Sequence, residues 1–243
     1  MTNNKQKTII AIELTNYCNI RCSHCPQGHL DVPVGYMDRE TLAQCLAYCD
    51  GYTEFNWRGE PTLHPNLVEY VRIAKEFNKK LNLGFHTNGI LLTERLFKDL
   101  AHTGLDWMHV SLHTLESCSK YKQIAEWNKK SGSPLGVYAE VDNTQEELMA
   151  RSCGFTSDMF CRDTTANWGG YLTDHRIVNA DAEKHAQNCM FINEYKFIAA
   201  WDGTINACCW DYQLLHALGN VKDFKDIRHS RFYKLCSSCI WIR

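Results

Sequence analysis

The chain has 243 residues, of which 44% are hydrophobic and 22% are charged. This is the composition of a globular protein, and it excludes a disordered or low-complexity chain. The 26 Lys and Arg residues nearly balance the 28 Asp and Glu residues, so we expect no nucleic-acid partner and no attachment to an anionic membrane surface.

The sequence also carries no membrane or export signal. No apolar stretch approaches the roughly 20 residues that a membrane-spanning helix needs, and the N-terminus lacks a signal-peptide pattern. We therefore expect a cytoplasmic protein. In that reducing compartment, an odd and large set of 13 cysteines indicates metal ligation or redox chemistry rather than disulfides.

The first part of the chain alternates short β-type runs with helical patterns. The predicted strands are Thr8–Leu14, Thr53–Trp57, Leu81–His86, Trp107–Leu112, Leu135–Val141 and Asp158–Asp163. The predicted helices cover residues 39–49, 65–80, 94–102, 116–130 and 145–152. Six such units predict a parallel sheet, either doubly wound or an incomplete barrel, because a full barrel needs eight.

The rhythm of the sequence changes after about residue 165. Residues 181–188 predict a short helix, and Lys196–Trp201 with Thr204–Cys208 predict a β-hairpin that turns at Asp202-Gly203. The tail from Asp223 to Leu235 is predicted as a helix. We expect two domains, residues 1–170 and residues 171–243.

Three cysteines follow the first predicted strand within one short loop. Cys18, Cys22 and Cys25 have the spacing C-x3-C-x2-C. A loop at the carboxyl end of a parallel strand is where α/β folds place their chemistry, and three thiolates there can hold a four-iron cluster. One iron of such a cluster is left without a protein ligand and can bind another molecule. Zinc ligation or idle thiols are the alternative.

This triplet resembles the cluster loop of the radical S-adenosylmethionine (radical SAM) superfamily. Arg58-Gly59-Glu60-Pro61 is similar to that family's Gly-Gly-Glu-Pro element, with arginine in place of the first glycine. Thr87-Asn88-Gly89 and the pair Ser111 and His113 match further positions. The resemblance implies a partial (β/α)6 barrel, a SAM-binding [4Fe-4S] cluster held by the triplet, and a SAM molecule on its open iron. The cofactor-binding residues that it implies are Gly59, Glu60, Asn88, Ser111 and His113.

Four later cysteines form a second group. Cys189, the Gly203-x4-Cys208 pattern and the pair Cys236-x2-Cys239 resemble the twitch-type C-terminal domain of radical SAM enzymes. That resemblance implies an auxiliary [4Fe-4S] cluster, which has no room for SAM because protein thiolates occupy all four irons. Cys209 is the spare thiol of the adjacent pair. A zinc ion held by the same four cysteines is the alternative.

Strand alternation predicts that one face of the sheet is polar. If the apolar residues of each strand face the helices, the opposite face carries a set of polar residues: Glu13, Asn56, Arg58, His86, Asn88, His109, Ser111, His113, Tyr138, Glu140 and Asp142. Burying so many polar groups without partners would be costly, so we expect this face to contact SAM, water and a polar substrate, or its residues to pair with one another.

Two redox centres favour a net oxidation. The resemblance implies that SAM is cleaved to a 5'-deoxyadenosyl radical, which abstracts hydrogen from the substrate, and that the auxiliary cluster accepts an electron. Candidate substrates are a sugar-like or aminocyclitol alcohol, or a ribosomal peptide, and the electron donor would be flavodoxin or ferredoxin. The predicted proton acceptors are His86, His113, Glu140 and Asp142, and Arg162 is predicted to bind a substrate oxygen. A redox-neutral isomerase and a zinc-stabilised binding protein are the competing hypotheses.

Overall fold

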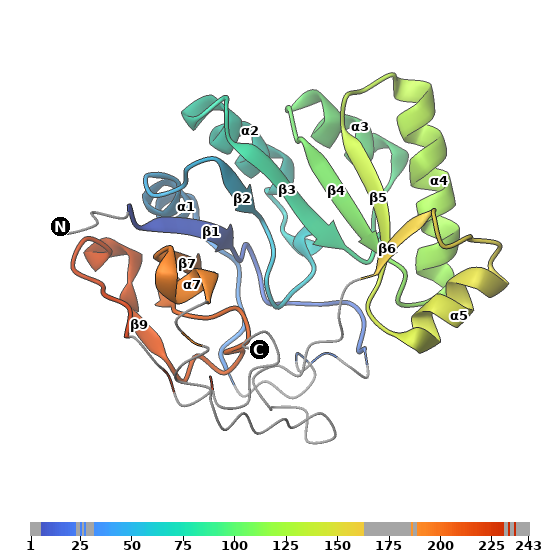
Figure 1. Ribbon diagram of the computed structural model, residues 1–243. Coiled ribbons are helices and arrows are strands. Elements are labelled where there is room, and N and C mark those ends of the chain that lie inside the picture. Colours follow the sequence, from blue (N-terminus) through green and yellow to red (C-terminus); the bar gives the residue numbers. More distant parts are fainter. Residues whose placement is uncertain are drawn as a thin grey trace. The chain divides into compact units, whose positions relative to one another are not determined.

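The computed structural model describes residues 6–22, 25, 27, 32–162, 186, 189–230, 233 and 236 (Figure 1). The chain divides into two compact units. The first unit comprises Met1–Asp50, Trp57–Gly59 and Ala166–Arg243, and the second comprises Gly51–Asn56 and Glu60–Thr165. Each unit is described by itself below.

The second unit is built on five parallel strands in the order β2-β3-β4-β5-β6. Their bounds are β2 Tyr52–Glu54, β3 Asn82–Thr87, β4 Trp107–Ser111, β5 Gly136–Val141 and β6 Phe160–Arg162. The connecting helices are η2 Pro61–Leu63, α2 Leu67–Phe77, α3 Glu94–His102, α4 Leu115–Ser131 and α5 Thr144–Ser152. The helices α2, α3 and α4 are neighbours in that order (Figure 1). The alternation of strand and helix thus produces the predicted parallel sheet.

Alternation along the strands decides which side chains form the core of this unit. Phe85 on β3 and Met108 and Val110 on β4 are fully buried. The residues between them, His86 and His109, are only partly buried and are register partners on adjacent strands. The predicted separation into an apolar and a polar face is therefore present in this sheet.

The helix starts of the second unit follow from local capping. Thr93 accepts a hydrogen bond from the Leu96 amide at the start of α3, and Thr114 accepts one from the Ser117 amide at the start of α4. Such side-chain acceptors satisfy amides that have no partner within the helix. The helix predicted over residues 65–80 begins only at Leu67, after the short turn η2.

The first unit joins an N-terminal strand to a C-terminal meander. Strand β1 Thr8–Ile12 pairs in parallel with β7 Lys196–Ala199, and β7, β8 Thr204–Asn206 and β9 Ala217–Asn220 are antiparallel. Its helices are α1 Arg39–Leu46, α7 Met190–Asn193 and η5 Val221–Asp223. The predicted hairpin is confirmed, with Gly203 in the left-handed conformation that its turn requires.

The prediction of a helical tail from Asp223 is wrong for residues 224–230, which form turns and irregular chain. One long-range contact and one local contact hold this segment instead. His229 Nε2 lies 2.8 Å from the Lys196 carbonyl oxygen, and the Ser230 amide donates to the Tyr233 hydroxyl at 2.8 Å. Strand β9 was not predicted. The helix predicted over 181–188 lies outside the described residues except for Ala186, which is helical.

The second predicted strand ends earlier than expected, at Glu54, because residues 57–59 leave the sheet and belong to the first unit. Among the described helices, none has the length and apolar character needed to span a membrane.

Candidate functional site

The predicted cluster loop presents three reduced thiols. Cys18, Cys22 and Cys25 are all partly buried and none forms a disulfide. The Cys25 amide donates to the Cys22 carbonyl oxygen at 3.1 Å, which folds the second half of the loop into a turn. Three accessible thiols on one turn of chain are the donor set that a [4Fe-4S] cluster requires. The residues present therefore fit the predicted cluster.

Two side chains that follow β1 hold the chain where it enters this loop. The Asn16 side chain donates to the Pro33 carbonyl oxygen at 2.9 Å and accepts from the Gly35 amide at 2.9 Å. The Thr15 hydroxyl donates to the Gly35 carbonyl oxygen at 2.7 Å. Because both side chains are buried, they fix where the cluster loop starts.

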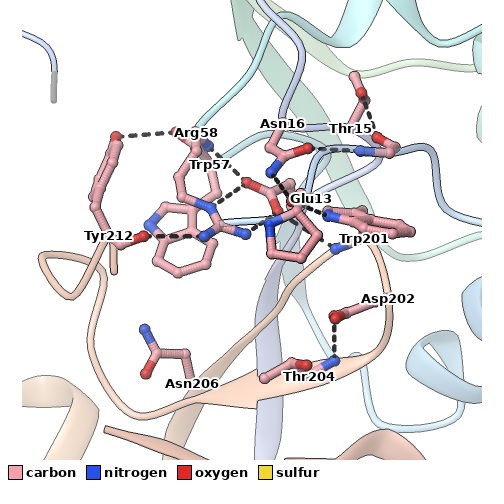
Figure 2. Close-up of polar contacts among 12 residues, drawn as sticks. Glu13, Thr15, Asn16, Trp57, Arg58, Trp201, Asp202, Thr204, Asn206 and Tyr212 are labelled. Carbon is pink, nitrogen blue, oxygen red and sulfur yellow. Dashed lines mark hydrogen bonds and ion pairs between the residues drawn. The ribbon is translucent and has the colours of Figure 1, made fainter. Parts of the chain in front are cut away.

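Arg58, which replaces the first glycine of the family element, forms a buried ion pair with Glu13 (Figure 2). Its Nε donates to Glu13 Oε1 at 2.7 Å and its Nη2 to Oε2 at 2.6 Å, while Nη1 donates to the Tyr212 carbonyl oxygen at 3.0 Å. The guanidinium also lies 4.3 Å from the Trp57 ring centroid. Both charged groups are thus paired within the first unit, which is the alternative that the sequence left open for residues of the polar face.

Gly59 lies too close to the start of the cluster loop for any side chain. A Cβ there would lie 2.3 Å from the Thr15 carbonyl oxygen and 2.6 Å from that of Tyr17. Real Cβ atoms do not approach that closely, so the glycine allows two backbone segments to pack. The close backbone packing therefore requires glycine at this position, independently of any cofactor.

Three of the predicted auxiliary ligands lie near one another in the first unit. Burial raises the pKa of the Cys236 thiol to about 11, and the neighbouring Cys208 and Cys189 contribute to that rise. The Trp210 amide donates to Cys208 Sγ at 3.4 Å. Cys239 lies outside the described residues.

The thiols of the adjacent residues Cys208 and Cys209 contact each other, and this contact and burial raise the pKa of Cys208. Cys208 acts electrostatically on both Cys189 and Cys236. Cys209 instead lies near Tyr212, and its carbonyl oxygen accepts from the Trp57 indole at 2.8 Å. Cys208 stays the predicted ligand, with Cys209 as the spare thiol beside it.

In the second unit, the Glu60 carboxylate is buried and accepts four hydrogen bonds. Oε1 accepts from the Thr62 amide at 3.1 Å and from the hydroxyls of Thr62 and Thr87 at 2.6 Å each, and Oε2 accepts from the Asn88 amide at 2.8 Å. The Asn88 side chain in turn accepts from the Ile90 amide. Glu60 therefore organises the turn after β3.

A network of imidazoles and carboxylates occupies the polar face of β3, β4 and β5. Glu140 Oε1 lies 2.8 Å from His86 Nδ1 and accepts from the Ser111 hydroxyl at 2.6 Å, and its Oε2 lies 3.1 Å from His109 Nδ1. Burial alone would raise the pKa of the Glu140 carboxyl, but the hydrogen bonds from His109, His86 and Ser111 outweigh it and hold that pKa far below its ordinary value. Glu140 is thus an anion that positions its neighbours.

A second network lies at the carboxyl ends of the same strands. His113 Nδ1 lies 2.8 Å from Glu146 Oε1 and 3.9 Å from Asp142 Oδ2, and the Asp142 amide donates to Glu146 Oε2 at 2.8 Å. Burial lowers the pKa of His113, but the hydrogen bond and charge of Glu146, with Asp142, outweigh it and raise that pKa. His113 therefore favours its protonated form. Arg162 ends β6, and its side chain lies outside the described part of the chain.

Sequence reasoning missed two acidic residues that belong to these networks. Glu54 Oε2 accepts from the Tyr52 hydroxyl at 3.0 Å and lies 3.9 Å from His86 Nε2. Glu146 pairs with His113 from helix α5. Strand alternation places Glu54 on the same face as Asn56 and could have revealed it. Nothing local to Glu146 could have, because its partner lies on a different element.

A parallel α/β sheet in a chain that also carries a loop with three closely spaced cysteines is typical of a class of iron–sulfur protein. Comparison with known families gives the class its name. Residues 12–130 match the model of the Radical SAM superfamily, so the chain carries a radical SAM domain, and the resemblance seen in its cysteine triplet is confirmed. A [4Fe-4S] cluster and SAM are the cofactors of that family.

Solved structures of the same fold extend over almost the whole chain. The crystal structure of BtrN in complex with AdoMet and 2-DOIA matches with a TM-score of 0.66 and 20% identity, over 96% of this chain and 85% of that one. Native anSMEcpe with bound AdoMet matches with a TM-score of 0.60 and 20% identity, over 89% of this chain and 78% of that one. The predicted α/β fold with a partial parallel barrel is confirmed.

Two relatives illustrate the range of similar sequences. A tungsten-containing aldehyde ferredoxin oxidoreductase cofactor-modifying protein from Pyrococcus furiosus is 35% identical over 43% of this chain, but the match covers only 30% of that protein. The S-adenosyl-L-methionine-dependent 2-deoxy-scyllo-inosamine dehydrogenase of Niallia circulans is 24% identical over 92% of this chain and 82% of its own length. This chain thus spans only about a third of the first of these relatives and most of the second.

Proposed function

We propose that the protein is a radical SAM oxidoreductase that removes two hydrogens from a polar substrate, of which a carbocyclic amino alcohol is the first candidate. The observation that carries the proposal is the set of reduced, partly buried thiols of Cys18, Cys22 and Cys25 within the matched domain. The length over which the chain matches a 2-deoxy-scyllo-inosamine dehydrogenase supports the substrate class.

The cofactors would be held by residues already described. Cys18, Cys22 and Cys25 would hold the SAM-binding cluster, and Cys189, Cys208, Cys236 and Cys239 the auxiliary [4Fe-4S] cluster. When bound, the first cluster with SAM supplies a one-electron reduction that yields a 5'-deoxyadenosyl radical, and the auxiliary cluster supplies an electron acceptor. Flavodoxin or ferredoxin is the proposed electron donor, and the twitch domain is proposed for residues 171–243.

The residues proposed to contact SAM are those that the family resemblance implies. We assign Glu60 to the methionyl amine of SAM, with Gly59, Asn88, Ser111 and His113 as its other contacts. Because Glu60 already accepts four hydrogen bonds, its carboxylate is pre-oriented and loses little conformational freedom on binding.

The four candidate proton acceptors belong to two different networks: His86 and Glu140 to one, and His113 and Asp142 to the other. The raised pKa of His113, caused by Glu146 and Asp142 against the effect of burial, makes it a donor to a substrate oxygen rather than an acceptor. We therefore propose Asp142, whose side chain is 26% exposed at the end of β5, as the acceptor of the carbinol proton. Arg162 is proposed to bind a substrate oxygen. His86 and Glu140 form part of the other network.

The atoms and electrons of the proposed oxidation balance. One hydrogen of the substrate carbinol carbon goes to the 5'-deoxyadenosyl carbon, the hydroxyl proton goes to the acceptor, and one electron goes to the auxiliary cluster, which leaves a ketone. The product is two hydrogens lighter than the substrate, whereas an isomerase would leave the mass unchanged.

Iron content and SAM cleavage test the cluster assignment. Anaerobically reconstituted protein should contain about eight irons per chain. The triple variant of Cys18, Cys22 and Cys25 to alanine should hold about half of that iron and form no 5'-deoxyadenosine with SAM and dithionite. Cys161→Ala, at an exposed thiol, is the control and should retain both. Cleavage by the triple variant would refute the assignment, and zinc in colourless protein would support a binding protein.

Adjacent thiols provide a matched pair for the auxiliary site. Cys208→Ala should lose about half of the iron while Cys209→Ala retains it. Substrate class is tested with 2-deoxy-scyllo-inosamine as the probe, by mass spectrometry of the product. A peptide substrate remains the proposal's alternative if this amino alcohol does not stimulate 5'-deoxyadenosine formation, since a solved neighbour, SuiB, binds a precursor peptide.

A further inference from the structure

The network on the polar face of β3, β4 and β5 has the donor set of a transition-metal site. Two imidazoles and one carboxylate, from His86, His109 and Glu140, present ligand atoms that all lie within 4.8 Å of one another. Two histidines with one carboxylate are a set that divalent first-row ions such as Fe²⁺, Mn²⁺ and Zn²⁺ occupy, usually with open positions for water or substrate.

The separations between these atoms suit ligands of one ion. Adjacent ligands at right angles, each about 2.1 Å from a metal, lie about 3.0 Å apart. The Glu140 oxygens lie 2.8 Å from His86 Nδ1 and 3.1 Å from His109 Nδ1. A shared proton fits the same distances, so charge has to decide between a proton and an ion.

Charge favours a cation at this site. Two carboxylates, Glu54 and Glu140, lie around the imidazoles, and no ion pair within the described residues joins either of them to Lys or Arg. Both are largely withdrawn from solvent, with side chains 25% and 8% exposed. Burial raises the pKa of Glu54 and so disfavours its charge, whereas Glu140 is held as an anion. A divalent ion would balance the Glu140 charge while taking the lone pair of each ring.

The site is also rigid before anything binds. His86 and His109 are register partners on adjacent strands, and Ser111 is the partner of Glu140 on the next pair. The Trp107 indole packs edge-on against both imidazoles, with centroid separations of 5.5 and 5.3 Å. The Ser111 hydroxyl fixes the Glu140 carboxylate, as outer partners commonly fix metal ligands.

One buried donor beside the site has no acceptor. Trp107 Nε1 is buried and makes no hydrogen bond among the described atoms. Leaving such a donor unpaired costs free energy, so an oxygen that arrives with a ligand would be stabilised by it.

We propose that His86, His109 and Glu140 bind one divalent first-row transition ion on the polar face of β3, β4 and β5. This site uses none of the cysteines, and the inference does not depend on the proposed oxidation. The ion would have room for a water or for an oxygen or nitrogen of a polar substrate.

Binding of Mn²⁺ to the reconstituted holoenzyme tests the site, because Mn²⁺ prefers oxygen and imidazole to thiolate. The experiment titrates Mn²⁺ and follows the EPR signal of free aqueous ion, since oxidised [4Fe-4S] clusters are diamagnetic. We expect one bound ion per chain with nitrogen couplings from two imidazoles. His109→Gln and Glu140→Gln should each lower the affinity at least about 100-fold, and Ser111→Ala about 10-fold.

Controls keep the test decisive. His102→Gln, at an exposed helix residue of the same unit, should bind Mn²⁺ as the wild type does. Among the described residues, His113, Asp142 and Glu146 form a second group that could hold a metal ion. If the ion binds at His86, His109 and Glu140, the His113→Gln variant should still bind Mn²⁺. Thermal unfolding identifies any variant that fails to fold, and Ser111→Ala then supplies the comparison.

Three results would overturn the proposal. These are no Mn²⁺ bound at millimolar concentration, binding that His109→Gln and Glu140→Gln leave unchanged, or binding abolished by His113→Gln instead. Failure here leaves 5'-deoxyadenosine formation untouched, so it is distinguishable from failure of the proposed function.

Discussion

Two polar groups of the molecule differ in how completely their charges are paired. One is the ion pair of Arg58 with Glu13, and the other is the network of His86, His109 and Glu140. The Arg58 and Glu13 side chains are 1% and 0% exposed, and each charge is met within the protein. The His86 and His109 side chains are 32% and 26% exposed, and within the described residues no Lys or Arg forms an ion pair with the Glu140 carboxylate between them. A fully paired group stabilises the fold, whereas an incompletely balanced one is available for chemistry.

Breaking the paired group should have the largest effect. Arg58→Met leaves the Glu13 carboxylate buried without its partner, and we expect it to lower the free energy of unfolding by about 3–5 kcal/mol. Urea denaturation followed by circular dichroism measures the change. The control is Arg95→Met, whose side chain is 92% exposed and should have little effect. Equal losses for both variants would show that the pair is not structural.

The network around His113 should show a pH-dependent contribution to stability. Its pKa is raised in the folded protein above the ordinary value of about 6.5, so the folded state holds the proton more tightly. That stabilisation is complete below the unfolded pKa and is lost as the pH rises through the folded one. The difference in unfolding free energy between wild type and His113→Asn should be about 1.5–3 kcal/mol at pH 5.5 and smaller at pH 9. A difference that grows with pH would contradict the raised pKa.

A substitution at Gly59, which follows Arg58 in the sequence, tests the packing near the ion pair without removing a charge. Gly59→Ala places a Cβ against the Thr15 carbonyl oxygen, and we expect a loss of about 1–3 kcal/mol in unfolding free energy. The added Cβ should push the start of the cluster loop aside, so the iron content of the reconstituted protein should fall as well. Gly132→Asn is the control, since that glycine has open space and asparagine tolerates its left-handed backbone. Full iron content in Gly59→Ala would show that the loop adapts.

The smallest effect is expected at a helix cap away from both groups. Thr93→Ala removes the acceptor for the Leu96 amide and should cost about 1 kcal/mol, read as a lower urea midpoint. This value sets the scale of an ordinary local change in the second unit. Thr93→Ser, which keeps the hydroxyl, should recover most of it; no recovery would point to lost packing rather than a lost cap.

Much of the sheet could be predicted because strand and helix patterns are local. The apolar alternation of Phe85, Met108 and Val110 places them in the core wherever the strands pair. The tail after Asp223 could not be predicted in the same way. Its residues are organised by contacts to Lys196 and Tyr233, and those contacts replace the helix that the composition suggested.

The candidate site divides along the same line. The cysteine triplet was recognisable because all three thiols lie on eight consecutive residues, and the glycine-rich element carried Gly59 and Glu60 with it. The buried partner of Arg58 was not recognisable, because Glu13 is separated from it by 45 residues. For these two residues the structure shows the second of the two expectations for the polar face, that its residues pair with one another.

The sequence by itself determined the chemistry of the cluster loop and the period of the strands, since spacing and alternation are properties of neighbouring residues. Only the tertiary structure decided which polar side chains are paired and buried within the protein and which are exposed enough to bind a ligand. His86 and Glu140 are 54 residues apart and meet only because β3, β4 and β5 pair in one register. A hydrogen bond across strands depends on that register, and register is a property of the folded sheet rather than of any segment in it.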